Sequence, residues 1–269
     1  MPEGDTIHRA AKRIGAALVG SEIRSIETPQ ARHDLDRWPE RLAGRAVRMV
    51  DAHGKHLFVR FDGGLTLHSH LRMTGAWGVY THGQRWRRAP NRAWLVIRTD
   101  EHDVVQFDGP VLELMTDGRA RFDQRLAALG PDPLGDDFDE NRYLRRLRED
   151  APTRGLGEAL LDQRNIAGLG NIWKNEGCFL AGISPWRRLS DVADDEALAV
   201  VRAIRPLMAA SVEGDGRITT FDGPARANEW RTWVHKRAGL PCRRCGTAIR
   251  SRGQGDDNRT AYWCPSCQR

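Results

Sequence analysis

Pro2 is the residue best suited to covalent chemistry in this sequence. If Met1 is removed, Pro2 begins the chain with a free secondary amine, and a small second residue is what permits that removal. Such an amine is a nucleophile that no internal residue offers, and it can form the covalent intermediates that Schiff-base enzymes otherwise make with a lysine. Glu3 follows directly and is placed to move protons at the same centre.

A second set of reactive side chains lies at the other end of the chain, in two CxxC pairs. Residues 246–263 separate the pairs, which is the spacing of a four-thiolate zinc site, and four thiolates leave no open position for water. A ribbon this short and polar needs the metal in order to fold, so the zinc is expected to be structural. Redox pairing is the alternative. The ligands would be Cys242, Cys245, Cys264 and Cys267.

Three polar residues are candidates for binding phosphate. Asn171 follows two glycines in LLDQRNIAGLGN and is expected to cap a helix whose free N–H groups attract an anion. Lys55 follows Gly54 at the start of an expected strand. Arg259 is expected near the tip of a hairpin between the cysteine pairs. The alternatives are an ordinary helix cap for Asn171 and surface charges for the other two.

The stretch His68-Ser69-His70-Leu71-Arg72-Met73-Thr74-Gly75 permits two interpretations. Two histidines on one face of a strand suggest a metal, but without a third ligand nearby they favour packing and hydrogen bonding. Met73 beside Arg72, ahead of a glycine turn, is typical of an exposed apolar wedge that enters duplex DNA.

A helix and a set of short strands are expected to position the residues of the first half of the chain. A helix is expected over residues 4–20 from apolar positions at helical spacing, with Asp5 or Thr6 as its N-cap. Its positive end would favour the neutral form of the amine. Short alternating runs then predict a β-sandwich or barrel-like domain, with a polar, mobile loop at 81–92. These runs are EIRSIE, RAVRMVDA, KHLFVRF, GLTLHSH, GAWGVY, AWLVIRT and HDVVQF, all within residues 22–114.

The second half of the chain is expected to be helical. LGPDPLG is a plausible linker because it combines two prolines with two glycines. Helical patterns follow, and the Leu-Gly-Asn step at 169–171 separates two of them. The four patterns are DFDENRYLRRLRED, GLGEALLDQRNIAG, NIWKNEGCFLAG and DVADDEALAVVRAIRPLMAASVEG.

Charge and composition narrow the class of partner. The net charge is +6 and the pI is about 9.4, which favours a polyanionic partner. No segment is apolar enough for a membrane span, and Glu3, Asp5 and Arg9 stand where a signal peptide needs an apolar run. We therefore expect a cytosolic protein with no membrane partner. The leftover Cys178 is expected to be buried.

Taken together and in this order, these motifs resemble the formamidopyrimidine-DNA glycosylase/endonuclease VIII family over most of the chain. Each motif is modest, but their joint occurrence is specific. They are PEG at 2–4, GKHL at 54–57, LGPDPL at 129–134, LLDQRNIAGLGN at 160–171, VHKRAGLPCRRCG at 234–246 and RTAYWCPSCQ at 259–268.

The resemblance implies an α+β protein with an N-terminal helix plus β-sandwich domain. A C-terminal helix-two-turn-helix domain with a zinc-ribbon finger would follow. The corresponding boundaries are 1–120 for the catalytic domain, 121–134 for a linker, 135–230 for the helical domain and 231–269 for the finger. The resemblance also implies that the protein binds damaged DNA and one structural zinc ion, and that it needs no nucleotide cofactor. It further implies a monomer in the bacterial cytosol.

The resemblance also assigns roles to single residues. Pro2 would be the nucleophile, Glu3 the proton donor and Lys55 a phosphate-binding catalytic lysine. Asn171 and Arg259 would contact DNA phosphates. Arg72 and Met73 would fill the gap that the displaced base leaves, with Leu71 as a competitor.

Two departures concern the lesion. The branch that removes oxidised guanine has an arginine one residue before a phenylalanine, whereas this chain has Val105-Gln106-Phe107, and its PEG start is typical of the endonuclease VIII branch. Thr6 stands where many relatives have a glutamate. The expected function is therefore a bifunctional glycosylase/AP lyase that excises oxidised pyrimidines and nicks the strand by β,δ-elimination. The alternatives are an oxidised-purine glycosylase and a non-catalytic zinc-ribbon DNA-binding protein.

Overall fold

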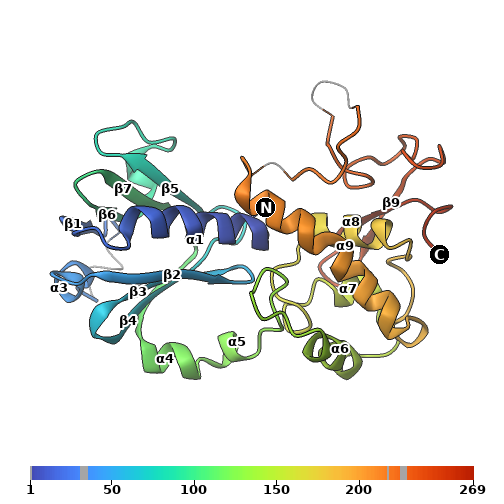
Figure 1. The fold of residues 1–269 in the computed structure, drawn as a ribbon, viewed down its shortest axis with the longest axis horizontal. Coiled ribbons are helices and arrows are strands. Elements are labelled where there is room, and N and C mark those ends of the chain that lie inside the picture. Colours follow the sequence, from blue (N-terminus) through green and yellow to red (C-terminus); the bar gives the residue numbers. More distant parts are fainter. Residues whose placement is uncertain (1, 31–35, 217, 225–228) are drawn as a thin grey trace. The chain divides into compact units, whose positions relative to one another are not determined.

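The computed structural model describes residues 2–30, 36–216, 218–224 and 229–269 (Figure 1). Met1 lies outside these residues, so its removal stays a prediction. The chain divides into two compact units. Unit 1 contains Pro2 and Thr6–Ala127, and unit 2 contains Glu3–Asp5 and Ala128–Arg269. Among the described residues, no helix combines the length and apolar character that crossing a membrane requires.

The first helix, α1, spans Gly4–Leu18. Ile7, Ala11, Ile14 and Leu18 are all buried, as their spacing predicts. The predicted cap is wrong because the helix begins at Gly4, so that Asp5 lies inside its first turn. The Asp5 carboxylate instead accepts hydrogen bonds from Trp173 Nε1 at 3.1 Å and Ser211 Oγ at 2.6 Å.

Unit 1 contains two four-stranded antiparallel sheets, ordered β1-β6-β7-β5 and β2-β3-β4-β8. The strands are β1 Ser25–Glu27, β2 Val47–His53, β3 His56–Phe61, β4 Leu65–His70, β5 Ala76–Thr81, β6 Ala93–Arg98, β7 His102–Phe107 and β8 Val111–Thr116. Strand β8 was not among the predicted runs. Inward residues of both sheets, such as Leu67 and Ile97, share one core with α1. Unit 1 also contains the short helices α3 Trp38–Leu42, α4 Asp117–Phe122 and α5 Gln124–Ala127.

The segment 81–92 is anchored to unit 1 by contacts that its polar composition did not predict. Trp86 packs edge-on against Phe107, with ring centroids 5.8 Å apart. Arg88 donates to Asp108 Oδ2 at 2.6 Å. The segment ends in a 3₁₀ turn, Pro90–Arg92.

The described part of unit 2 contains four α-helices and a hairpin: α6 Glu140–Glu149, α7 Leu156–Ala159, α8 Asn171–Leu180, α9 Asp194–Glu213, β9 Arg250–Gln254 and β10 Arg259–Trp263. The helix predicted over GLGEALLDQRNIAG is wrong beyond Ala159, because side chains there replace helical hydrogen bonds. Gln163 donates to the carbonyls of Leu161 and Leu169 and accepts from the Gly168 N–H. The chain consequently turns before α8 begins.

Candidate active site

The N-terminus of α8 holds the carboxylate of Glu3. The N–H groups of Ile172 and Trp173 donate to Glu3 Oε1 and Oε2 at 2.9 and 3.3 Å, and Glu3 is 1% exposed. Gly170 leaves room for this carboxylate, since a Cβ there would lie 2.2 Å from Glu3 Cδ. The N–H groups of Ile172 and Trp173 are therefore not free for a phosphate, contrary to the prediction for this helix end, whereas the phosphate contact of Asn171 stays a prediction.

A second close approach fixes the same segment. Gly4 N donates to Gly168 O at 2.9 Å, and a Cβ on Gly4 would lie 2.9 Å from Gly168 Cα. The PEG and AGLGN motifs, distant in sequence, are thus the two halves of one packing arrangement. This arrangement places Glu3, the neighbour of Pro2, at a helix N-terminus that stabilises negative charge.

Lys174, which the sequence analysis did not single out, lies one turn into α8. Its side chain is 0% exposed, and within the described part of the chain its Nζ has no hydrogen-bond partner. Burial lowers the pKa of Lys174 to about 8, while the nearby Cys178 and Glu3 act in the opposite direction. A buried cation next to Glu3 is unusual enough to be a functional signal. The predicted burial of Cys178 is correct.

Asn171 contacts the hairpin that carries Arg259. Gly170, not Asn171, is the N-cap of α8, so the predicted cap is wrong. Asn171 Nδ2 donates to Thr260 O at 2.8 Å, and its buried Oδ1 has no hydrogen-bond partner in the described chain. Arg259 begins β10 with a side chain that is 40% exposed. The structure therefore brings these two predicted phosphate contacts onto adjacent elements.

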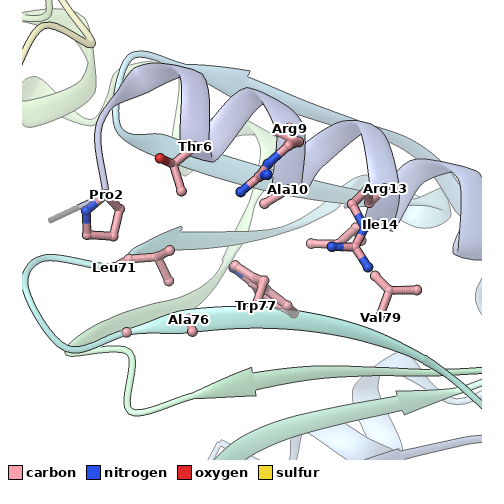
Figure 2. A pocket seen from close by; sticks show the side chains of 11 residues that line it. Pro2, Thr6, Arg9, Ala10, Arg13, Ile14, Leu71, Ala76, Trp77 and Val79 are labelled. Atoms are coloured by element: carbon pink, nitrogen blue, oxygen red, sulfur yellow. The ribbon is translucent and has the colours of Figure 1, made fainter. Parts of the chain in front are cut away.

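Pro2 lies at one end of a groove in unit 1. Figure 2 shows α1 and β5 as the two sides of this groove, with Arg9 and Arg13 on α1 and Trp77 and Val79 on β5. The groove has a volume of about 230 Å³. Pro2 is only partly buried, so its ring is accessible from this space.

Lys55 lies in the two-residue turn between β2 and β3, not in the strand itself. Gly54 has a left-handed φ of 59°, and the pairing of His53 with His56 closes the turn. Lys55 is close enough to His70 to influence it. Burial lowers the pKa of His70 to about 4, and Arg72 and Lys55 lower it further by charge repulsion.

The histidines of the second sheet form a hydrogen-bonded cluster on its outer face. His56 Nδ1 lies 2.8 Å from His68 Nε2, and His68 Nδ1 lies 3.5 Å from Glu113 Oε2. Burial lowers the pKa of His56 to about 3, so the ring is neutral at pH 7. The contact between His56 and His68 supports the interpretation that these histidines serve packing and hydrogen bonding.

The expected wedge lies in an exposed turn after β4. Arg72 has a left-handed φ of 45° and Met73 is 62% exposed. Leu71, the competing wedge, is 3% exposed and belongs to the core, so that alternative is wrong. Arg88 Nη1 donates to Thr74 O at 2.8 Å as well as to Asp108, which ties the turn to segment 81–92.

The four cysteines meet at the C-terminal ribbon (residues 239–269). Their Sγ atoms all lie within 4.8 Å of one another, with 3.9 Å between Cys242 and Cys267 and 3.5 Å between Cys245 and Cys264. A tetrahedron with metal–sulfur bonds of about 2.3 Å has edges of about 3.8 Å. The arrangement fits one zinc ion with no open position.

Comparison with known proteins agrees with this assembly of parts. Residues 1–122 match the formamidopyrimidine-DNA glycosylase N-terminal domain, residues 129–222 match the formamidopyrimidine-DNA glycosylase H2TH domain, and residues 239–269 match the zinc finger found in FPG and IleRS. In fold, the chain is similar to a Lactococcus lactis FPG mutant in complex with Fapy-dG containing DNA, with a TM-score of 0.81 over the whole of both chains at 24% identity.

Similarity in sequence also extends over the whole chain. Probable endonuclease 8 2 of Streptomyces coelicolor is 42% identical over 100% of this chain and 94% of its own length. DNA-(apurinic or apyrimidinic site) lyase Nei2 of Mycolicibacterium smegmatis is 38% identical over 100% and 99%. A formamidopyrimidine-DNA glycosylase of Dinoroseobacter shibae is 31% identical.

These matches define a DNA glycosylase fold with a zinc finger, and the chain belongs to the formamidopyrimidine-DNA glycosylase/endonuclease VIII family. Within that family it lies on the endonuclease VIII-like branch. The predicted α+β architecture and the structural zinc ion are confirmed.

Proposed function

We propose that the protein is a bifunctional DNA glycosylase/AP lyase that excises oxidised pyrimidines. The observation that carries the proposal is the position of Pro2 at the end of an accessible groove, with the adjacent Glu3 fixed at the N-terminus of α8. Relatives named endonuclease 8 and DNA-(apurinic or apyrimidinic site) lyase, at 38–42% identity over the whole chain, support the same activity.

The reaction follows from one amine. The neutral nitrogen of Pro2 attacks C1′ of the sugar, and the damaged base leaves with the electron pair of the glycosidic bond and takes a proton from water. Glu3 accepts the proton that the nitrogen releases and returns it to the ring oxygen, so that the C1′–O4′ bond opens and an iminium forms. The base must first leave the stack, because C1′ is inaccessible inside a duplex.

Strand cleavage uses the same covalent intermediate. The iminium acidifies the C2′ proton, whose loss expels the 3′ phosphate by breaking the C3′–O bond. Loss of the C4′ proton then expels the 5′ phosphate. Both steps need only the nitrogen of Pro2 as an electron sink and bases that accept the two protons.

The remaining site residues hold the DNA. Lys55, Asn171 and Arg259 are assigned to phosphates, as the exposure of Arg259 and the turn position of Lys55 permit. Arg72 and Met73 are assigned to the gap in the duplex, and the exposure of Met73 supports this role. The four ribbon cysteines are assigned to zinc.

Borohydride reduction of the enzyme with abasic or thymine-glycol DNA tests the nucleophile. A covalent protein–DNA adduct is expected, because reduction of the iminium makes the N–C1′ bond permanent. Pro2→Gly retains a terminal amine and should give a weaker adduct. A chain that retains Met1, identified by its intact mass, should give none. Strand cleavage without an adduct would contradict the assignment, and faster cleavage of 8-oxoguanine than of thymine glycol would favour the oxidised-purine alternative.

Finer properties belong to the same proposal. We infer a cytoplasmic monomer without a nucleotide cofactor, and a ligand set of free thiolates is consistent with a reducing compartment. The linker is assigned to 121–134, and the division of the chain after Ala127 supports this range. The catalytic, helical and finger domains are assigned to residues 1–120, 135–230 and 231–269.

A further inference from the structure

The groove beside Pro2 is in the right place for a displaced base. The base is bonded to the same sugar carbon that Pro2 attacks, so it must lie next to Pro2 when the reaction begins. The groove starts at Pro2 and has about 230 Å³, below the ~300–1,000 Å³ of pockets for drug-sized ligands. A single base therefore suits its size.

The β5 side of the groove offers a flat apolar surface. Trp77 donates its indole N–H to Ser69 Oγ at 3.2 Å, which leaves the ring face as the surface available to a ligand. Ala76 and Val79 line the groove on the same strand (Figure 2). Aromatic faces of this kind stack on nucleic-acid bases regardless of sequence.

The α1 side offers hydrogen-bond donors. Arg9 and Arg13 line the groove, and within the described chain neither guanidinium has a hydrogen bond or an ion pair. A guanidinium has five N–H donors and no acceptor. Among the described residues that line the groove, none carries a carboxylate, and Thr6 contributes the only hydroxyl. A ligand that presents carbonyl oxygens is therefore complementary to this side.

Arg9 is the arginine that reaches a base at Pro2. At 1.5 Å per residue, Arg9 lies about 7.5 Å along the helix from Gly4, whereas Arg13 lies about 13.5 Å away. Side chains on a helix lean towards its N-terminus, so Arg9 extends back towards Pro2. Arg13 is too distant from the reacting sugar to contact the same base, and thus provides a matched control.

We propose that Arg9 is a specificity-determining residue that donates hydrogen bonds to carbonyl oxygens of the displaced base, which stacks on Trp77. The groove then favours oxidised pyrimidines with two carbonyl groups, such as thymine glycol, over those with an exocyclic amine, such as 5-hydroxycytosine. This inference rests on the proposed glycosylase function and specifies its substrate class.

The test compares Arg9→Gln, Arg9→Lys and Arg13→Gln with the wild-type enzyme on three duplexes, which contain thymine glycol, 5-hydroxycytosine or a preformed abasic site. Arg9→Gln should lower kcat/KM for thymine glycol at least tenfold and for 5-hydroxycytosine less. Arg9→Lys, which keeps a charged donor, should recover part of the loss. Arg13→Gln, whose side chain is too far from the reacting sugar to contact the base, should leave the ratio of the thymine-glycol rate to the 5-hydroxycytosine rate unchanged.

Borohydride trapping on the abasic duplex separates this inference from the proposed function. No base has to be recognised there, so Arg9→Gln should trap within threefold of the wild type. An equal loss on all three duplexes would show that Arg9 acts on the strand or the fold, and would overturn the inference. So would an unchanged thymine-glycol rate in Arg9→Gln, or a wild-type preference for 5-hydroxycytosine. Failure of the wild-type enzyme to trap abasic DNA would instead overturn the function itself.

Discussion

Unit 1 and the zinc ribbon bury apolar side chains on very different scales. In unit 1, α1 and both sheets contribute to one continuous core, with fully buried residues such as Ile14, Phe61 and Leu67. The apolar cluster at the ribbon contains Phe179, Val234 and Ile249 together with two of its cysteines, Cys242 and Cys264. Burial of apolar surface, at ~25 cal/mol per Å², stabilises unit 1, whereas the zinc ribbon depends on its metal.

Zinc removal should give the largest difference between the two regions. In a chelator, β9 and β10 should lose hydrogen-exchange protection and DNA binding should be lost, while β3 and β4 stay protected. The substitution Cys245→Ser should reproduce this result. Cys178→Ala removes a thiol that is not a ligand and serves as the control. Persistent protection of β9 and β10 without metal would contradict the comparison.

Acid should have the second-largest effect. It should lower the stability of unit 1 through the histidine cluster. The folded pKa of His56 is about 3, below the ordinary 6.5, so the unfolded chain binds a proton that the folded chain excludes. Stability is therefore complete above pH 6.5 and falls as the pH drops towards 3. The shift corresponds to about 5 kcal/mol at most.

The variant His56→Phe should lose less stability than the wild type over that interval, measured by hydrogen exchange in β3 and β4. His53, His68, His70 and Arg125 also face this ring, and their charges add to the acid sensitivity. Exchange in α8 and α9 should not change between the two proteins. An identical acid profile for the variant in β3 and β4 would remove His56 as the cause.

Lys174 gives unit 2 a dependence of the same sign as that of His56, but at alkaline pH. Its folded pKa of about 8 lies below the ordinary 10.5, so between these values the unfolded chain holds a proton that the folded chain lacks. Wild-type stability should consequently rise by up to about 3 kcal/mol as the pH increases from 8 to 10.5.

Lys174→Met should abolish that rise and should be more stable than the wild type at pH 7, because it removes a buried cation. Denaturant unfolding at several pH values measures both effects. The control is Lys12→Met at an exposed position of α1. If the stability of Lys174→Met still rose between pH 8 and 10.5, another titrating group would be the cause.

Arg88 should have a smaller effect, confined to unit 1. It joins Thr74 of the wedge turn to Asp108, so Arg88→Ala should loosen the turn and slow cleavage of duplex lesions several-fold. In a single-stranded substrate the displaced base leaves no gap in a duplex for the wedge to fill. Such substrates should therefore be cleaved at the wild-type rate. The exposed Arg85, changed to Ala, is the control. Equal losses on both substrates would mean that Arg88 does not act through the wedge.

Much of the fold was predictable because it follows from local patterns. Helical spacing located α1 and α8, alternation located most strands, and cysteine spacing located the zinc ligands. Strand β8 and the end of α7 were missed for physical reasons. The outer face of β8 carries Glu113 against a buried His68, and Gln163 replaces backbone hydrogen bonds that a helix would have made.

The sequence by itself determined the reactive groups, namely the amine of Pro2, the carboxylate of Glu3 and four thiolates, because residue identity alone fixes their chemistry. Tertiary structure decided what each group faces. It placed Glu3 on the N–H groups of α8, buried Lys174 nearby and gave the Arg9 side chain no partner among the described residues in the groove beside Pro2. No local pattern contains this information, because it depends on glycines at 4, 168 and 170 that let distant segments approach closely.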